Sequence, residues 1–180
     1  MKLGIFKAWN DKDWQSYEKA CVDLNAEYEI IDLLSANWIE SIKNSKCDGF
    51  LCRPPCDIQE RKSIYDEKLY FITHFMNKKI YPSYDELFIY ENKRNMAYFL
   101  ETFNYPHPKT RIFSKKEDAL TFVNSCNFPI VFKSNIGAGA SGVNIVKTKN
   151  EALSIINQIF GRLHPRFTFG KVIWTKYKNF

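Results

Sequence analysis

The chain has 180 residues, of which 45% are hydrophobic and 26% charged, so it holds enough apolar material for one domain or two small ones. No apolar run approaches the length of a membrane span, and residues 1–7 are too short and too charged for a signal peptide. We therefore expect a cytoplasmic protein without a membrane partner. Five cysteines, an odd number without a secretory signal, predict reduced thiols, and no histidine lies near them to complete a metal site.

The formal charge of +6 is unevenly distributed along the chain. Residues 1–80 carry 12 Lys and Arg against 13 Asp and Glu, whereas residues 81–180 carry 14 against 7. A basic half of this kind suits the binding of a polyphosphate ligand, and the binding of nucleic acid is the competing explanation for the charge. Because the chain has no recognised nucleic-acid motif, no basic helix and no run of interleaved aromatic and basic residues, we expect no nucleic-acid partner.

The first part of the chain alternates between strand and helix patterns. The expected order is a strand at 3–6, a helix over 14–24, a strand at 28–34, a helix over 38–42, a strand at 49–52 and a helix over 64–76. This alternation indicates right-handed crossovers and a mostly parallel sheet, hence a small α/β domain. Ligands of such sheets bind at the carboxyl ends of the strands, where residues 7–10 and 53–57 fall.

Arg53 is the candidate substrate-binding residue at this edge. We expect its guanidinium to meet an anionic group of the substrate. A surface arginine beside two prolines, Pro54 and Pro55, is an equally open interpretation.

Residues 81–84, Tyr-Pro-Ser-Tyr, are predicted to separate a domain at 1–82 from a second at 83–180. A helix is expected to begin near Asn92, and the proline-containing turn at 105–110 ends it, because proline does not continue a helix. One face of this helix carries Met96, Leu100 and Phe103.

Two further helices are predicted from capping boxes. Ser114 with Glu117 precedes an apolar pattern that ends at Cys126, and Thr148 with Glu151 precedes another. The apolar pattern of the second of these helices consists of four residues: Leu153, Ile156, Ile159 and Phe160.

Between those helices lies the most informative segment of the chain. An apolar strand over 128–133 ends in Lys133, a loop of small residues follows over 137–142, and a second strand is predicted at 143–146. Gly and Ala let the backbone approach a ligand closely, and unpaired loop N–H groups suit an anion such as phosphate. The segment therefore predicts a phosphate-binding hairpin, and a plain hairpin turn without a ligand is the alternative.

The loop spells G-x-G-x-x-G, a pattern that other nucleotide-binding proteins also use. A dinucleotide-binding fold requires a helix after the glycines, whereas here a strand pattern follows. The G-x-x-x-x-G-K-[ST] phosphate loop is excluded because Val143 stands where its lysine belongs. Protein kinases place their lysine after the loop, and the chain has neither H-R-D nor D-F-G.

Over residues 93–160 the expected order is helix, strand, helix, strand, glycine loop, strand, helix, and with these residues it resembles the ATP-grasp superfamily. Lys93, before the Pro-x-Pro-x-Thr turn, looks like the family's first nucleotide lysine, and Lys133, 40 residues later, looks like the second. The resemblance covers about residues 81–160, and the preceding α/β unit matches the family's usual first domain. The resemblance thus implies an α/β protein: a parallel-sheet domain, then an α+β ATP-grasp subdomain with a glycine-rich β-loop-β.

The resemblance also implies a ligand and a reaction. ATP would be held by these cofactor-binding residues: Lys93, Lys133, Gly137, Ala138, Gly139, Ala140, Ser141 and Gly142. The family joins a carboxylate to an amine or similar nucleophile through an acyl phosphate, so the expected partners are a nucleotide and a small carboxylate substrate.

The chain departs from the family pattern after Glu151, where it has no acidic residue. The family's later half supplies acidic residues and an asparagine that hold Mg²⁺, which prefers carboxylate oxygens. The interpretation is a truncated front part of a ligase, with residues 172–174 as a strand leading to the missing half and Mg²⁺ bound only in the complete protein. The alternative is a non-catalytic remnant that binds a nucleotide or a partner.

Overall fold

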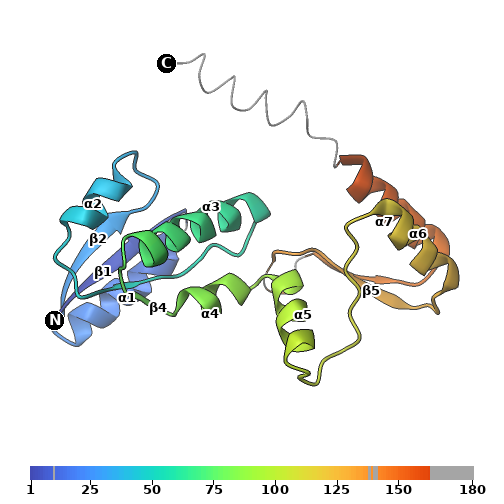
Figure 1. Ribbon diagram of the computed structural model, residues 1–180, viewed down its shortest axis with the longest axis horizontal. Coiled ribbons are helices and arrows are strands. Elements are labelled where there is room, and N and C mark those ends of the chain that lie inside the picture. Colours follow the sequence, from blue (N-terminus) through green and yellow to red (C-terminus); the bar gives the residue numbers. More distant parts are fainter. Residues whose placement is uncertain (10, 138, 140–141, 163–180) are drawn as a thin grey trace, which may run out of the picture. The chain divides into compact units, whose positions relative to one another are not determined.

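The structure, a computed structural model, describes residues 1–9, 11–137, 139 and 142–162 (Figure 1). Contacts divide the chain into two compact units, each described separately below. The first unit comprises Met1–Pro108 and Ser134–Gly142, and the second comprises Lys109–Lys133 and Val143–Phe180. Four predicted features lie outside the described residues: Ala138, Ala140, Ser141 and the strand at 172–174. The boundary expected at residues 82 and 83 stays a prediction.

A parallel sheet with helices forms most of the first unit. Its strands are β1 (Lys2–Lys7), β2 (Glu27–Asp32), β3 (Gly49–Leu51) and β4 (Ile80–Tyr81), in the order β2-β1-β3-β4. Its crossover helices are α1 (Asp11–Asp23), α2 (Trp38–Asn44) and α3 (Gln59–Tyr70), the last continuing as the π-helical turn η1 (Phe71–Phe75). All strand pairs are parallel, which confirms the predicted α/β fold with a parallel sheet.

The helices cover both faces of this sheet, as right-handed crossovers on either side of β1 require. Figure 1 shows α1 on one face and α2 and α3 on the other. On the α3 side, the rings of Phe6 and Phe50 stack with centroids 5.0 Å apart. The ring of Phe50 also lies over Gly4, where an added Cβ would be 2.3 Å from Phe50 Cδ1. Gly4 therefore makes room for the central aromatic residue of the core.

Two further helices belong to the first unit, α4 (Tyr84–Ile89) and α5 (Lys93–Thr102). The start of α5 agrees with the prediction, but α4 and the two-residue strand β4 were not expected. A capping box begins α4: Ser83 Oγ accepts from Glu86 N–H, and Glu86 Oε2 accepts from Ser83 N–H at 2.8 Å. The spacing Ser83-x-x-Glu86 is the signature of such a box, so the sequence did contain the signal for α4.

The predicted apolar faces of two helices agree only in part with the structure. On α3 and η1, Leu69 and Ile72 are buried, whereas Ile64 and Phe75 are exposed. The buried face of α3 also carries a charged pair, Lys62 and Asp66. On α5, Met96 and Phe103 are 41% and 57% exposed. Apolar spacing alone does not recognise a buried face that is partly charged or an aromatic face that lacks a covering layer.

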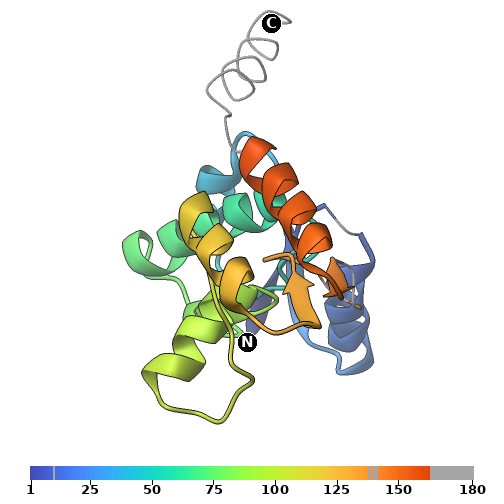
Figure 2. The same cartoon turned by 90° about the vertical axis from the view of Figure 1, so that its right-hand side faces the viewer.

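The second unit is a β-hairpin covered by two helices. Its elements are α6 (Lys116–Ser125), β5 (Ile130–Lys133), β6 (Val143–Val146) and α7 (Lys149–Arg162). Figure 2 shows α6 and α7 side by side over the hairpin. The core consists of Ala119, Val123, Val146, Ala152 and Ile156, with partly buried neighbours that include Phe128, Ile130 and Phe132.

The helix starts of the second unit agree only in part with the predicted capping boxes. The N-cap of α6 is Lys115 rather than Ser114, and it makes no side-chain capping bond. At α7, Thr148 Oγ1 accepts from Glu151 N–H at 3.3 Å, but Glu151 Oε2 accepts from Lys147 N–H instead of closing the box. Of the four apolar residues predicted on α7, Ile156 is buried in the core, Leu153 and Phe160 pack against it, and Ile159 is 37% exposed. Among the described residues, no helix is both long and apolar enough to cross a bilayer.

Candidate nucleotide-binding site

One face of the β5–β6 hairpin is open. The strands are antiparallel, and Val131 lies opposite Ile145 while Lys133 lies opposite Val143. Directly opposed residues project from the same face of the sheet. Val131 and Ile145 are 56% and 66% exposed, whereas Val146, on the helix-covered face, is 2% exposed. The predicted nucleotide lysine, Lys133, therefore lies at the end of an exposed apolar surface.

The loop between the two strands has a closed neck. Ser134 N–H donates to Gly142 O at 2.8 Å, and Ser134 Oγ donates to Ile136 O at 3.0 Å. Gly142 has φ +71°, and a Cβ there would lie 2.0 Å from Ser134 Oγ. Gly139 has φ +59° and open space around its Cα. Glycine is thus required at 142 by backbone conformation and close approach, and favoured at 139 by conformation.

The other predicted nucleotide lysine begins α5. Asn92 Oδ1 caps this helix by accepting from Asn95 N–H at 3.1 Å. Lys93 follows as the first helical residue, and its Nζ donates to Gly137 O at 2.6 Å. Two predicted site residues, 44 positions apart in the sequence, are therefore in direct contact within the first unit.

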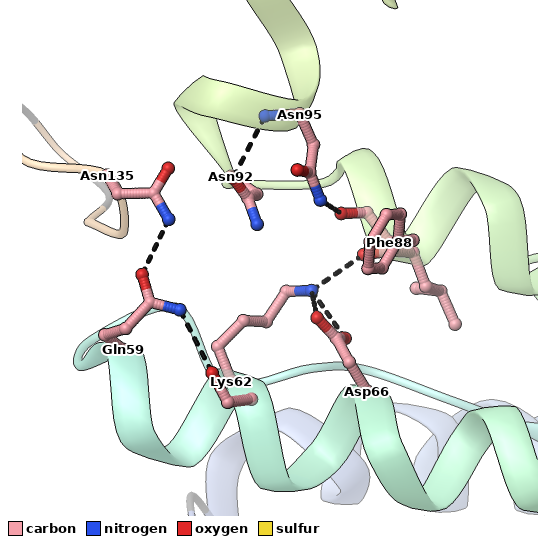
Figure 3. Close-up of polar contacts among 9 residues, drawn as sticks. Gln59, Lys62, Asp66, Phe88, Asn92, Asn95 and Asn135 are labelled. Atoms are coloured by element: carbon pink, nitrogen blue, oxygen red, sulfur yellow. Dashed lines mark hydrogen bonds and ion pairs between the residues drawn. The ribbon is translucent and has the colours of Figure 1, made fainter. Parts of the chain in front are cut away.

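Asn135 joins the base of the loop to two helices, a role that the sequence did not predict. Its backbone O accepts from Lys93 N–H at 3.0 Å, and its Oδ1 accepts from Arg94 N–H at 3.0 Å. Its Nδ2 donates to Gln59 Oε1 on α3 at 2.6 Å. Figure 3 shows the Asn135 amide facing the Gln59 amide across the gap between loop and helix. No local pattern signals these contacts, because the partners are 41 and 76 residues away.

A buried ion pair lies beside this network on α3. Lys62 Nζ donates to both carboxylate oxygens of Asp66 at 2.6 Å, and to Leu87 O of α4 at 3.0 Å (Figure 3). Burial lowers the pKa of the Lys62 ammonium and raises the pKa of the Asp66 carboxyl, because each charge loses its hydration. The pair links α3 to the last turn of α4, immediately before the segment that carries Lys93.

The predicted substrate residue Arg53 lies at a different place in the first unit. It follows β3, at the point where the strand order reverses between β1 and β3, the usual ligand position of open α/β sheets. Its Nε is 3.2 Å from Asp13 Oδ1, and its side chain is 52% exposed. A shallow hollow at this edge is lined by Arg53 together with Trp9, Trp14 and Asp13.

No metal site accompanies these residues. Within the part of the chain that the structure describes, no three His, Cys, Asp or Glu side chains are grouped so that they could hold a metal ion. The predicted site residues of the first unit form two groups: the loop with Lys93, and Arg53 in its hollow. Lys133 belongs to the second unit.

Comparison with known proteins identifies the loop-bearing segment. A family model described as the phosphoribosylglycinamide synthetase, ATP-grasp (A) domain, matches residues 91–173, a range that includes both lysines and the whole glycine loop. This match rests on sequence and is independent of the geometry above.

Solved structures of low sequence identity share the fold. A RimK domain ATP-grasp protein from Sphaerobacter thermophilus has a TM-score of 0.61 at 12% identity, with 89% of this chain and 59% of that chain covered. The biotin carboxylase domain of 2-oxoglutarate carboxylase from Hydrogenobacter thermophilus, solved with MgADP, ADP and bicarbonate, has a TM-score of 0.62 at 11% identity, covering 93% and 42%. N5-carboxyaminoimidazole ribonucleotide synthetase from Thermotoga maritima has a TM-score of 0.54 at 21% identity, covering 85% and 42%.

The chain thus spans between 42% and 59% of the length of these structures. The sequence match covers the glycine loop and both lysines, and the fold likeness extends over most of the chain. Residues 91–173 thus match an ATP-grasp family model, and the fold of the chain is similar to that of ATP-grasp proteins.

Proposed function

We propose that this chain is the ATP-binding portion of an ATP-grasp ligase, with Lys93, Lys133 and the loop at residues 137–142 as its nucleotide site. The observation that carries the proposal is the contact of Lys93 Nζ with Gly137 O at 2.6 Å. An ammonium group has three donors, so Lys93 can hold the loop carbonyl and still donate to a phosphate oxygen. A cation beside glycine-loop amides is the combination that polyphosphate binding requires.

The open face of the hairpin is the proposed binding surface for the nucleoside of ATP. Val131 and Ile145 offer an exposed apolar surface on which a purine ring can lie, and Lys133 projects from the same face. Burial of this surface under a flat ring removes apolar area from water, which favours binding. The positive charge of Lys133 would then meet the polar groups attached to the base and ribose.

The proposed reaction joins a carboxylate to an amine or a similar nucleophile through an acyl phosphate. Phosphoryl transfer depends on positioning and charge neutralisation more than on a protein nucleophile. The roles of Lys93 and the loop amides are therefore to bind and orient the phosphates, while Lys133 holds the nucleoside end of ATP. The described residues do not fit a Mg²⁺ site, since no carboxylate cluster is present among them, and we assign no step of the reaction to a metal here.

Arg53 is the proposed contact for the carboxylate substrate. The Nε of Arg53 lies 3.2 Å from Asp13 Oδ1, and a guanidinium has five N–H donors, so the same side chain can also donate to a substrate carboxylate. Trp9 and Trp14 in the same hollow supply apolar walls. Arg53→Lys should weaken binding of a carboxylate substrate while leaving ATP affinity unchanged, and equal loss of both affinities would contradict this role.

Calorimetric titration of ATP into the full chain tests the nucleotide site. Lys133→Ala should weaken ATP binding by about 1.5–3 kcal/mol, the scale of a hydrogen bond to a charged group. Lys149→Ala is the matched control, because it removes the same charge from an exposed lysine at the start of α7. Equal affinities of the Lys133 variant and the wild-type chain would refute the role of Lys133, and no ATP binding by the wild-type chain would refute the proposed function.

A further inference from the structure

We propose that Asn135 is a positioning residue that fixes the base of the glycine loop to α3 and to the start of α5, and thereby sets the position of Lys93 relative to the loop. The effect on phosphate binding rests on the proposed function, whereas the fixing of the loop base does not. Asn135 uses three polar groups for this purpose: its Nδ2, its Oδ1 and its backbone O.

The attachment of the loop base is continuous over three residues. Asn135 accepts from the backbone N–H groups of Lys93 and Arg94, and Ile136 forms a β-bridge with Asn92. Gly137 O then accepts from Lys93 Nζ. These links hold residues 135–137 against residues 92–94, so the carbonyl that Lys93 contacts is placed by the bonds of Asn135.

Only part of this attachment depends on a side chain, and that part can be altered. The backbone bonds form with any residue at position 135, whereas the bonds to Arg94 N–H and to Gln59 are made by the side chain of Asn135. Gln59 Nε2 in turn donates to Ser63 Oγ at 3.1 Å, which directs Gln59 Oε1 toward Asn135. The Asn135–Gln59 contact therefore joins two oriented amides.

The chemistry of this contact predicts which substitutions preserve it. Gln59→Glu keeps an oxygen for Asn135 Nδ2, and Ser63 can donate its hydroxyl to the other carboxylate oxygen. Asn135→Asp keeps the acceptor for Arg94 N–H, and a turned Gln59 amide can donate to it. The two changes together place two carboxylates face to face, which removes the contact and adds repulsion. Each single variant should therefore behave like the wild type, and the double variant should not.

The first experiment needs no nucleotide. The full chain is treated with a limiting amount of an N-hydroxysuccinimide ester, and acylation of Lys93 is measured by peptide mass spectrometry relative to exposed Lys109 in the same sample. Lys93 should react several-fold faster in Asn135→Ala and in Asn135→Asp/Gln59→Glu than in the wild type. Both conservative single variants should match the wild type. An unchanged Lys93 rate in the folded double variant would overturn the proposal.

Stability is checked in parallel by circular dichroism and urea unfolding. If Asn135→Ala does not fold, the decision rests on Gln59→Leu, which removes the same contact from the surface of α3, and on the double variant.

The second experiment separates positioning from general structural support. In Asn135→Ala, affinity for ATP should fall about five- to tenfold while affinity for adenosine stays unchanged, because the proposed function assigns the loop to the phosphates. An equal fall for both ligands would show a general structural role and overturn the positioning claim. If the wild-type chain binds neither ligand, the proposed function fails, and the acylation rates still decide whether Asn135 fixes the loop base.

Discussion

The sheet of the first unit and the hairpin of the second unit are built on different principles. In the first unit, helices cover both faces, and central residues such as Ile5 and Phe50 are at most 1% exposed. In the second unit, helices cover one face only, and the other exposes Val131 and Ile145. A sheet buried on both sides is a scaffold, whereas a sheet with one open apolar face has surface left for a ligand.

The two interiors also differ in polarity. The first unit buries the ion pair of Lys62 and Asp66 and the polar cap Asn92. Within the described residues of the second unit, every fully buried side chain is apolar. Lys62 and Asp66 lie on α3 and Asn92 caps α5, the two helices to which Asn135 at the base of the glycine loop is bonded. Their role in stability can therefore be tested apart from the apolar core.

The largest effect is expected from Lys62→Met. This substitution leaves Asp66 buried without its partner and Leu87 O without its donor, so the free energy of unfolding should fall by about 3–5 kcal/mol. Urea unfolding followed by circular dichroism measures the change. The double variant Lys62→Met/Asp66→Leu is the control, because replacing both charges by apolar groups should recover most of the loss. A double variant as unstable as the single one would show that the unpaired charge is not the cause.

A steric effect in the sheet comes next. Gly4→Ala places a Cβ 2.3 Å from the buried ring of Phe50 and should destabilise the chain by about 1–3 kcal/mol. Gly49→Ala is the matched control on the neighbouring strand, because its Cβ would be 3.7 Å from Lys79 O, an ordinary contact. The same unfolding assay compares them, and equal losses would contradict the steric explanation.

Adjacent residues of β6 test the contrast between covered and open faces. Val146→Thr buries a hydroxyl without a partner and should cost about 1–3 kcal/mol of unfolding free energy. Ile145→Thr, on the open face, should change stability by less than about 0.5 kcal/mol while weakening ATP binding. Thermal unfolding and ATP titration measure the two effects, and a large destabilisation by Ile145→Thr would show that this face is covered.

The smallest effect concerns pH. Hydrogen bonds from the Ser83 hydroxyl and backbone N–H lower the pKa of Glu86 from its ordinary value. The folded state thus holds this proton more weakly than the unfolded state, so the stabilisation is full above the ordinary glutamate pKa, about 4.3, and is lost as pH falls through the lower folded value. Glu86→Gln should make stability less dependent on pH between about 3 and 5. Urea unfolding across this pH range measures the change in stability. Asp85→Asn is the control for the loss of one negative charge.

Much of the fold was predictable because it depends on local periodicity. Alternating strand and helix patterns predicted the parallel sheet, and the strand ending in Lys133 before a glycine loop predicted the β5–β6 hairpin. The start of α5 was predicted at the residue that caps it, Asn92. The helix α4 was missed although Ser83 and Glu86 spell its capping box. That omission was an error of interpretation, because the signal is present in four consecutive residues.

The candidate site was predictable only in its cations and glycines. Lys93, Lys133 and the loop belong to a sequence pattern, and the family match covers all of them. Asn135 and Gln59 belong to no pattern, since each is a common polar residue whose partner lies in a distant segment. The buried face of α3 was predicted only in part for a related reason: Lys62 and Asp66, four residues apart, have the spacing of an exposed helical ion pair.

The sequence by itself thus determined the types of the main elements, the resemblance to the ATP-grasp superfamily and the candidate phosphate-binding residues, because these follow from spacing and residue chemistry along the chain. Only the tertiary structure decided that Lys93 contacts Gly137, that Asn135 joins the loop to α3, and that one hairpin face stays open. These features depend on which segments, distant in the sequence, pack against one another. That packing determines which hydrogen bonds form and which face stays exposed, and neighbouring residues in the sequence do not.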